Sequence, residues 1–203
     1  MEHREPYLHL RALDHADLDE AAALLGRGMV DNPIHVSVYG ADERKREERH
    51  SSLMRVLLEH SPAMTVDGVE QGGSLVGVAA SAPPGRCRPT AAARLRLLTQ
   101  AAAFGPRTAG RLLTWNRTWA THDISEPHVH LGPVSVDRHR RRRGIGTVMM
   151  LRHTAHLDSV GVAGYLETDR WEAVNFYRRH GYSVIGETDI LGVPTWFMRR
   201  PPA

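Results

Sequence analysis

A basic loop with two glycines, lying between a predicted strand and a predicted helix, constrains this chain more than any other feature. Residues 128–136 read as a strand and residues 146–160 as a helix. Backbone N–H groups converge at such a helix N-terminus, where anions bind. Gly144 and Gly146 carry no Cβ, so a phosphate can approach the backbone closely. The loop that joins the strand to the helix reads Val136-Asp137-Arg138-His139-Arg140-Arg141-Arg142-Arg143-Gly144-Ile145-Gly146-Thr147. It predicts a cradle for a polyphosphate.

Other interpretations of this loop fit less well. A Walker loop needs Gly-x-x-x-x-Gly-Lys-Ser/Thr, and no such run exists in the chain. A dinucleotide fingerprint needs a small residue three places after Gly146, where Met149 stands. The arginines also allow a solvated or nucleic-acid-facing patch. Few aromatic residues interleave with them and no groove-reading module is visible, so the cradle is favoured and no nucleic-acid partner is expected.

The rest of the chain predicts a mixed sheet with helices between its strands. Its 203 residues suit one domain, residues 1–203, with a helical insertion at about 90–121. Turns are expected at Gln71-Gly72-Gly73 and Gly192-Val193-Pro194. Strands are expected at 7–13, 63–69, 74–81, 128–136, 163–168, 182–190 and 195–199, and helices at about 14–28, 42–60, 90–121, 146–160 and 171–180. This order indicates an α/β or α+β domain.

Composition excludes several classes of protein. Mean hydropathy is −0.37, and no apolar run approaches the roughly 20 residues that span a bilayer, so no membrane partner is expected. The stretch Met1–Pro6 lacks the apolar core of a secretion signal. The lone cysteine, Cys87, excludes an internal disulfide and a cysteine-rich metal site, and the scattered histidines predict no metal site. A reducing, cytoplasmic setting is expected.

The loop and the residues after it resemble a known family. The run Arg141-x-x-Gly144-x-Gly146, placed between strand and helix, resembles the acetyl-CoA loop of the GNAT superfamily of N-acetyltransferases. The downstream runs are similar to the subgroup that includes puromycin N-acetyltransferase, and they read Tyr165-Leu166-Glu167-Thr168, Asn175-Phe176-Tyr177-Arg178-Arg179-His180-Gly181-Tyr182 and Trp196-Phe197-Met198-Arg199-Arg200-Pro201. The likeness is specific over residues 128–200. Arg142 departs from it, because many members have glycine there.

The resemblance implies a fold, a cosubstrate and a site. The fold would be a mixed, mostly antiparallel sheet flanked by helices and splayed where acetyl-CoA binds. The backbone of Val134, Ser135 and Val136 would pair with pantetheine, and Asn175 would contact the pantetheine arm. The pyrophosphate would lie on the N–H groups of the loop, comprising Arg141, Arg142, Arg143, Gly144, Ile145, Gly146 and Thr147. Tyr177 would donate a proton to the departing thiolate, because a phenol can act as a general acid.

The resemblance leaves the base and the acceptor open. The acceptor would be a primary amine of a small molecule or peptide, attacking the thioester directly, and a homodimer is possible. A general base is open among His122, Asp123, Glu126, His130 and Glu167, with a water relay as a further option. Trp115 and Trp119 share a helix face, as core or as pocket wall. The alternative function is a non-catalytic acyl-CoA-binding or sensor domain.

Overall fold

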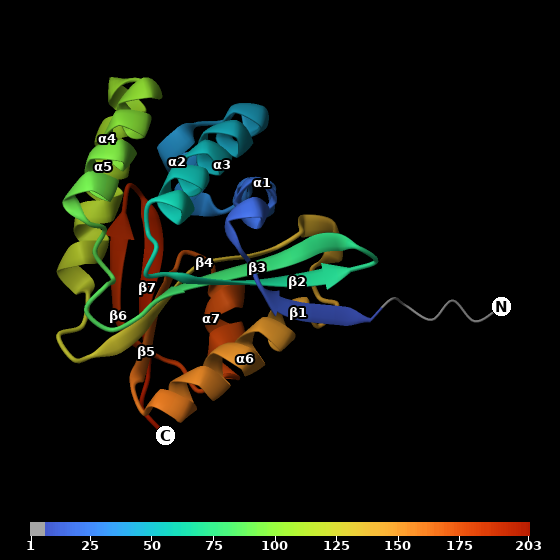
Figure 1. Ribbon diagram of the computed structural model, residues 1–203. Helices are drawn as coiled ribbons and strands as arrows, with labels where there is room; N and C mark the ends of the chain where they lie inside the picture. The colour runs from blue at the N-terminus through green and yellow to red at the C-terminus, as the bar shows by residue number, and fades with distance from the viewer. Residues whose placement is uncertain (1–6) are drawn as a thin grey trace.

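The computed structural model describes residues 7–203, so Met1–Pro6 lies outside the described residues. Its seven-stranded sheet has the order β1-β2-β3-β4-β5-β7-β6 (Figure 1). The strands are β1 (Leu8–Ala12), β2 (Thr65–Gln71), β3 (Ser74–Ala82), β4 (His128–Val136), β5 (Ala163–Thr168), β6 (Ser183–Ile190) and β7 (Val193–Arg200). The helices are α1 (Leu18–Met29), α2 (Pro33–Tyr39), α3 (Glu43–Glu59), α4 (Ala91–Ala103), α5 (Pro106–His122), α6 (Ile145–Val160) and α7 (Trp171–Arg178), with short 3-10 turns at η1 (His15–Asp17) and η2 (Arg138–Arg140).

The sheet is mostly antiparallel and opens in the middle, as predicted. The pair β4–β5 is parallel, and every other neighbouring pair in the described sheet is antiparallel. In the described chain β5 pairs with β4 over three positions, His128 to His130, and the two strands then part. The remainder of β4, from Leu131 to Val136, therefore keeps a backbone edge that β5 does not cover.

Helices cover both faces of the sheet. Asp14 accepts a hydrogen bond from the backbone of Ala16 in a capping box that starts η1 and leads into α1. The fully buried side of α1, including Leu24 and Leu25, packs with α3 on one face of β2 and β3. Helix α6 buries Met149 and Met150 against the opposite face (Figure 1). This leaves the N-terminus of α6 beside the open edge of β4.

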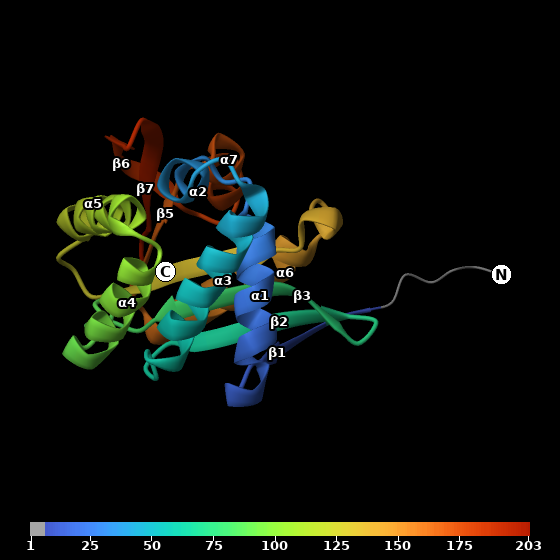
Figure 2. The ribbon, with the colours of Figure 1, turned by 90° about the horizontal axis from the view of Figure 1, so that it is seen from above.

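The predicted insertion forms two helices, α4 and α5. Gly105, at a φ of +92°, separates them. They pack with α2 and with the hairpin end of β6 and β7 through Trp115, Ile190 and Val193 (Figure 2). They thereby form a wall beyond the end of the sheet. Within residues 7–203 no helix is long and apolar enough to cross a membrane.

The structure corrects three local predictions. The segment between the predicted helices, residues 29–41, contains a helix that was not predicted, α2, with Pro33 in its first turn, where a missing N–H costs nothing. Gly72 and Gly73, both at positive φ, make the first hairpin turn by themselves, so Gln71 belongs to β2. Leu191 and Gly192 likewise make the last turn, so Val193 and Pro194 belong to β7.

Candidate active site

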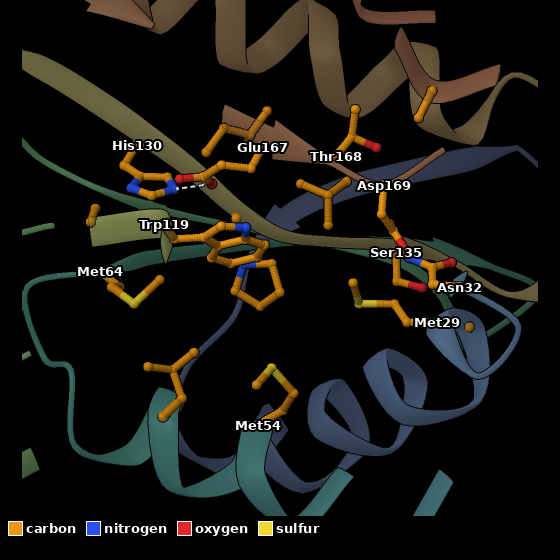
Figure 3. Close-up of a pocket in the computed structure, with 18 of the residues that line it drawn as sticks. Met29, Asn32, Met54, Met64, Trp119, His130, Ser135, Glu167, Thr168 and Asp169 are labelled. Atoms are coloured by element: carbon orange, nitrogen blue, oxygen red, sulfur yellow. Dashed lines mark hydrogen bonds and ion pairs between the residues drawn. The ribbon is translucent and has the colours of Figure 1, made fainter. Parts of the chain in front are cut away.

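A cavity of about 1400 Å³ lies where β4 and β5 part. Figure 3 shows part of its wall, with side chains from α1, α3, α5, β4 and β5 facing a common space. The structure brings most of the predicted site residues to this cavity, namely Val134, Ser135, Val136, Arg141, Arg142, Gly144, Ile145, Gly146, Thr147, Asn175 and Tyr177. Arg143 is exposed and lies outside the lining.

The loop before α6 has a backbone that only a few residue types favour. Gly144 is the N-cap of α6 at a φ of +81°, and a Cβ built there would meet no described atom within 4 Å. The first-turn N–H groups of α6 have no acceptor inside the helix, and no described side chain caps them. Arg142 also lies at positive φ, +65°. A residue with a Cβ is strained at positive φ, so this position favours glycine.

The side chain of Arg141 turns away from the helix terminus. Its guanidinium donates to both carboxylate oxygens of Asp31, at 2.7 and 2.8 Å, and to the carbonyl oxygen of Gly28. Hydrogen bonds from Arg141 lower the pKa of Asp31 to about 2, against the effect of burial. Arg141 therefore ties the basic loop to the end of α1, and its N–H remains the group available to an anion.

Helix α7 presents a phenol and an amide to the cavity. Tyr177 packs against Phe176, with ring centroids 5.4 Å apart, and burial raises the pKa of Tyr177 to about 12. The phenol is therefore protonated at neutral pH and holds a proton to donate. Asn175 is exposed at the cavity rim. A Cβ on Gly146 would lie 3.2 Å from the ring of Phe176, so Gly146 allows α6 and α7 to approach closely.

A polar cluster occupies the opposite wall. Nε2 of His130 lies 2.8 Å from Oε2 of Glu167, whose side chain is 3% exposed (Figure 3). Burial lowers the pKa of His130, but Glu167 and Cys87 outweigh burial and raise it to about 10. Burial raises the pKa of Cys87, and hydrogen bonds with His128 and His130 lower it to about 7. An imidazolium beside a buried carboxylate therefore marks this wall at neutral pH.

The structure separates the candidate bases. Asp123, His130 and Glu167 line the cavity. His122 stacks on Phe197, with centroids 4.2 Å apart, and Glu126 is ion-paired with Arg199, so neither belongs to this wall. Sequence reasoning missed Cys87 and His128 because Cys87 follows β3 and lies 41 residues before His128. No spacing rule connects two such distant positions.

The wall nearest α1, α3 and α5 is largely apolar. Its larger side chains are Met29, Met54, Leu57, Met64, Trp115 and Trp119. Trp115 is buried and contributes to the core, yet both tryptophans also face the cavity. Their Nε1–H groups are buried and have no hydrogen-bond partner among the described residues. This apolar wall of the cavity therefore offers two indole N–H donors.

Comparison with solved structures supports the fold. A Corynebacterium glutamicum protein described as histone acetyltransferase HPA2 and related acetyltransferase is 20% identical, with 98% and 97% of the two chains covered and a TM-score of 0.73. Drosophila melanogaster polyamine N-acetyltransferase is 12% identical, covered at 95% and 99%, with a TM-score of 0.63. Agmatine N-acetyltransferase is 14% identical, covered at 95% and 98%, with a TM-score of 0.62.

A family model gives the assignment that these structures alone do not. The model of the acetyltransferase (GNAT) family matches residues 34–182. That range contains the basic loop, the parting strands β4 and β5, and most of the cavity wall. The match covers well over half of the chain. This chain belongs to the GNAT acetyltransferase family.

Proposed function

We propose that this protein transfers an acetyl group from acetyl-CoA to a primary amine of a small molecule or peptide by direct attack. One observation carries the proposal. The uncovered edge of β4, the uncapped N-terminus of α6 and the phenol of Tyr177 all line one cavity. These are an extended-chain binder, an anion binder and a proton donor, which are the groups that a coenzyme A thioester requires.

The residues present fit acetyl-CoA. The backbone of Val134, Ser135 and Val136 offers an edge on which pantetheine can lie as an added strand. The open space at Gly144 leaves the helix N-terminus accessible, so a pyrophosphate can receive the N–H groups of the loop and first turn. Asn175 lies at the rim, within the same lining, where it can contact the pantetheine arm. Bound acetyl-CoA supplies the activated acetyl thioester.

Two groups on opposite walls handle the protons. The acceptor arrives as an ammonium and must lose a proton before it can attack. We assign this step to the Glu167 carboxylate, which His130 orients, directly or through one water. As the C–N bond forms and the C–S bond breaks, Tyr177 donates its proton to the departing sulfur, because burial keeps the phenol protonated, and the second proton that the amine nitrogen loses restores the phenol. The acid and the base thus remain separate.

The wall chemistry defines a class of acceptor. Thioether and indole side chains favour an apolar body, whereas Glu167 and Asp123 attract its ammonium group. The two unpartnered indole N–H groups call for acceptor oxygens on that body. We therefore propose an amine joined to an aromatic or aliphatic frame that carries carbonyl or hydroxyl oxygens.

A panel of amines assayed with acetyl-CoA for thiol release tests this function. We expect apolar primary amines to release coenzyme A faster than highly charged polyamines. Acetyl-CoA alone should stabilise the fold by about 2.7 kcal/mol at a hundredfold excess over its Kd, because it binds the folded state only. Stabilisation without thiol release for any amine would support the sensor alternative. If acetyl-CoA gave neither stabilisation nor thiol release with any amine, both functions would be refuted.

Gly144→Asp should abolish acetyl-CoA binding while leaving the fold intact. The added carboxylate would stand at the helix N-terminus, where the pyrophosphate is expected, and no described atom would clash with its Cβ. Gly144→Asn is the matched control, because asparagine tolerates positive φ and has the same shape without the charge. Calorimetric titration should show a much larger loss for Asp than for Asn. Equal affinities for the two variants would place the phosphates elsewhere.

A further inference from the structure

Three metal-binding side chains meet at the cavity wall. A donor atom from each of Cys87, His128 and His130 lies within 4.8 Å of the other two. His128 and His130 face the same side of β4, because strand side chains alternate. Cys87 reaches them from the segment between β3 and α4. His128 is buried, and the other two are half-buried. The cluster is therefore shielded yet accessible from the cavity.

The hydrogen bonds of His128 fix its tautomer. Its Nδ1 lies 2.9 Å from the carbonyl oxygen of Glu126, which can only accept, so Nδ1 holds the proton. Nε2 faces a thiol and a carboxylate, with Sγ of Cys87 at 3.3 Å and Oδ1 of Asp123 at 3.2 Å. Oδ1 of Asp123 is buried and forms an ion pair with this ring nitrogen when the ring is protonated. A proton on Nε2 satisfies these electron-pair donors, and a metal ion that replaces this proton would satisfy them as well.

His130 has the same division between its nitrogens. Nε2 donates to the Glu167 carboxylate, which leaves Nδ1 as the ligand atom, and a metal ion would displace the proton that Nδ1 carries in the imidazolium. A ligating histidine commonly donates its second N–H to a carboxylate or a carbonyl oxygen, which fixes the ring orientation. Glu167 provides this support for His130, and the Glu126 carbonyl provides it for His128. Both rings are thus held with one nitrogen free to bind an ion.

We propose that Cys87, His128 and His130 form a binding site for a divalent transition-metal ion of the zinc class. Bonds of about 2.0–2.3 Å in a tetrahedral site place neighbouring donor atoms roughly 3.3–3.8 Å apart, and the 3.3 Å between Cys87 and His128 fits. One thiolate with two imidazoles suits zinc and disfavours magnesium or calcium. The Asp123 carboxylate lies beside His128, where it can balance the charge of the ion, and Cys87 and His130 both line the cavity.

Cobalt(II) reports on this site directly. Full-length protein freed of metal with a chelator and titrated with Co²⁺ should bind one ion, with a thiolate-to-cobalt charge-transfer band and the intense visible bands of tetrahedral cobalt. Zn²⁺ should displace it. Cys87→Ser should remove the charge-transfer band. His128→Gln should weaken binding by at least about 100-fold, because even outer-shell changes cost 10–100-fold.

A second readout does not depend on variants. Cys87 is the only cysteine, so alkylation of the whole protein reports on this one thiol. Zn²⁺ should slow that alkylation by at least about tenfold, and Mg²⁺ should leave it unchanged. His139→Gln, at an exposed residue of η2, is the matched control and should bind cobalt as the wild type does. An absent charge-transfer band, or alkylation equally fast with Zn²⁺, would overturn the proposal. Neither measurement requires acetyl transfer.

Discussion

Tyr177→Phe should lower kcat for acetyl transfer by roughly 10²–10⁴-fold, the usual contribution of general acid catalysis. The change deletes one oxygen and keeps the ring, so packing against Phe176 is preserved. Affinity for acetyl-CoA should therefore stay nearly the same. The measurement is steady-state kinetics beside calorimetric binding. The loss should shrink with a thioester of a more acidic thiol, whose leaving group needs less protonation.

Tyr182→Phe provides the matched control. Its phenol lies near Tyr177, with ring centroids 6.1 Å apart, but it is buried against His153 and outside the cavity lining. Deleting that oxygen removes a buried hydrogen bond, so it should affect stability more than rate. Full kcat in Tyr177→Phe, where chemistry limits the rate, would assign the proton to another group or to water. Equal losses of rate and coenzyme binding would make Tyr177 a binding residue.

Mild acid should destabilise the protein through its buried histidines. His35, His50 and His153 are buried, and burial lowers the pKa of each, to about 3 for His50 and about 4 for His153. The unfolded chain binds these protons near pH 6.5, whereas the folded chain excludes them. The contribution of these histidines to stability is therefore greatest above pH 6.5 and falls as the pH drops toward 4. At pH 5, His50 and His153 should each remove about 2 kcal/mol, or about 4 kcal/mol together, and His35 acts in the same direction. The pKa of His130 is raised, so its contribution has the opposite sign.

The loss from the buried histidines is a large fraction of the whole stability of a typical domain, about 5–15 kcal/mol. Urea unfolding between pH 7.5 and 5 should show it. His153→Gln cannot take up a proton in this range and can still donate to the phenol of Tyr182. It should reduce the loss of stability between pH 7.5 and 5 by about 2 kcal/mol. A free energy of unfolding that stays constant from pH 7.5 to 5 would show that these rings admit protons without unfolding.

Local patterns in the sequence predicted most of the fold and many of the residues that line the cavity. The glycine loop sits between contiguous elements, so its strand, turn and helix follow from nearby residues. The same holds for the motif around Tyr177. The ion pair of the Arg141 side chain could not be predicted from local patterns, because its partner Asp31 lies 110 residues earlier. Cys87, His128 and the apolar acceptor wall likewise depend on tertiary packing, which no local spacing encodes.

The contacts of Asp31 connect the two subsites proposed for acetyl-CoA and for the amine acceptor. Arg141 from the loop before α6 and Arg170 from the loop after β5 both contact this carboxylate, and Asp169 accepts from the N–H of Ile34 at 2.8 Å. The turn between α1 and α2, which lines the acceptor side, is thus clamped to both cosubstrate-side loops. Occupancy of either subsite should alter affinity at the other by the same factor. We expect any thermodynamic coupling between the proposed donor and acceptor to pass through this junction.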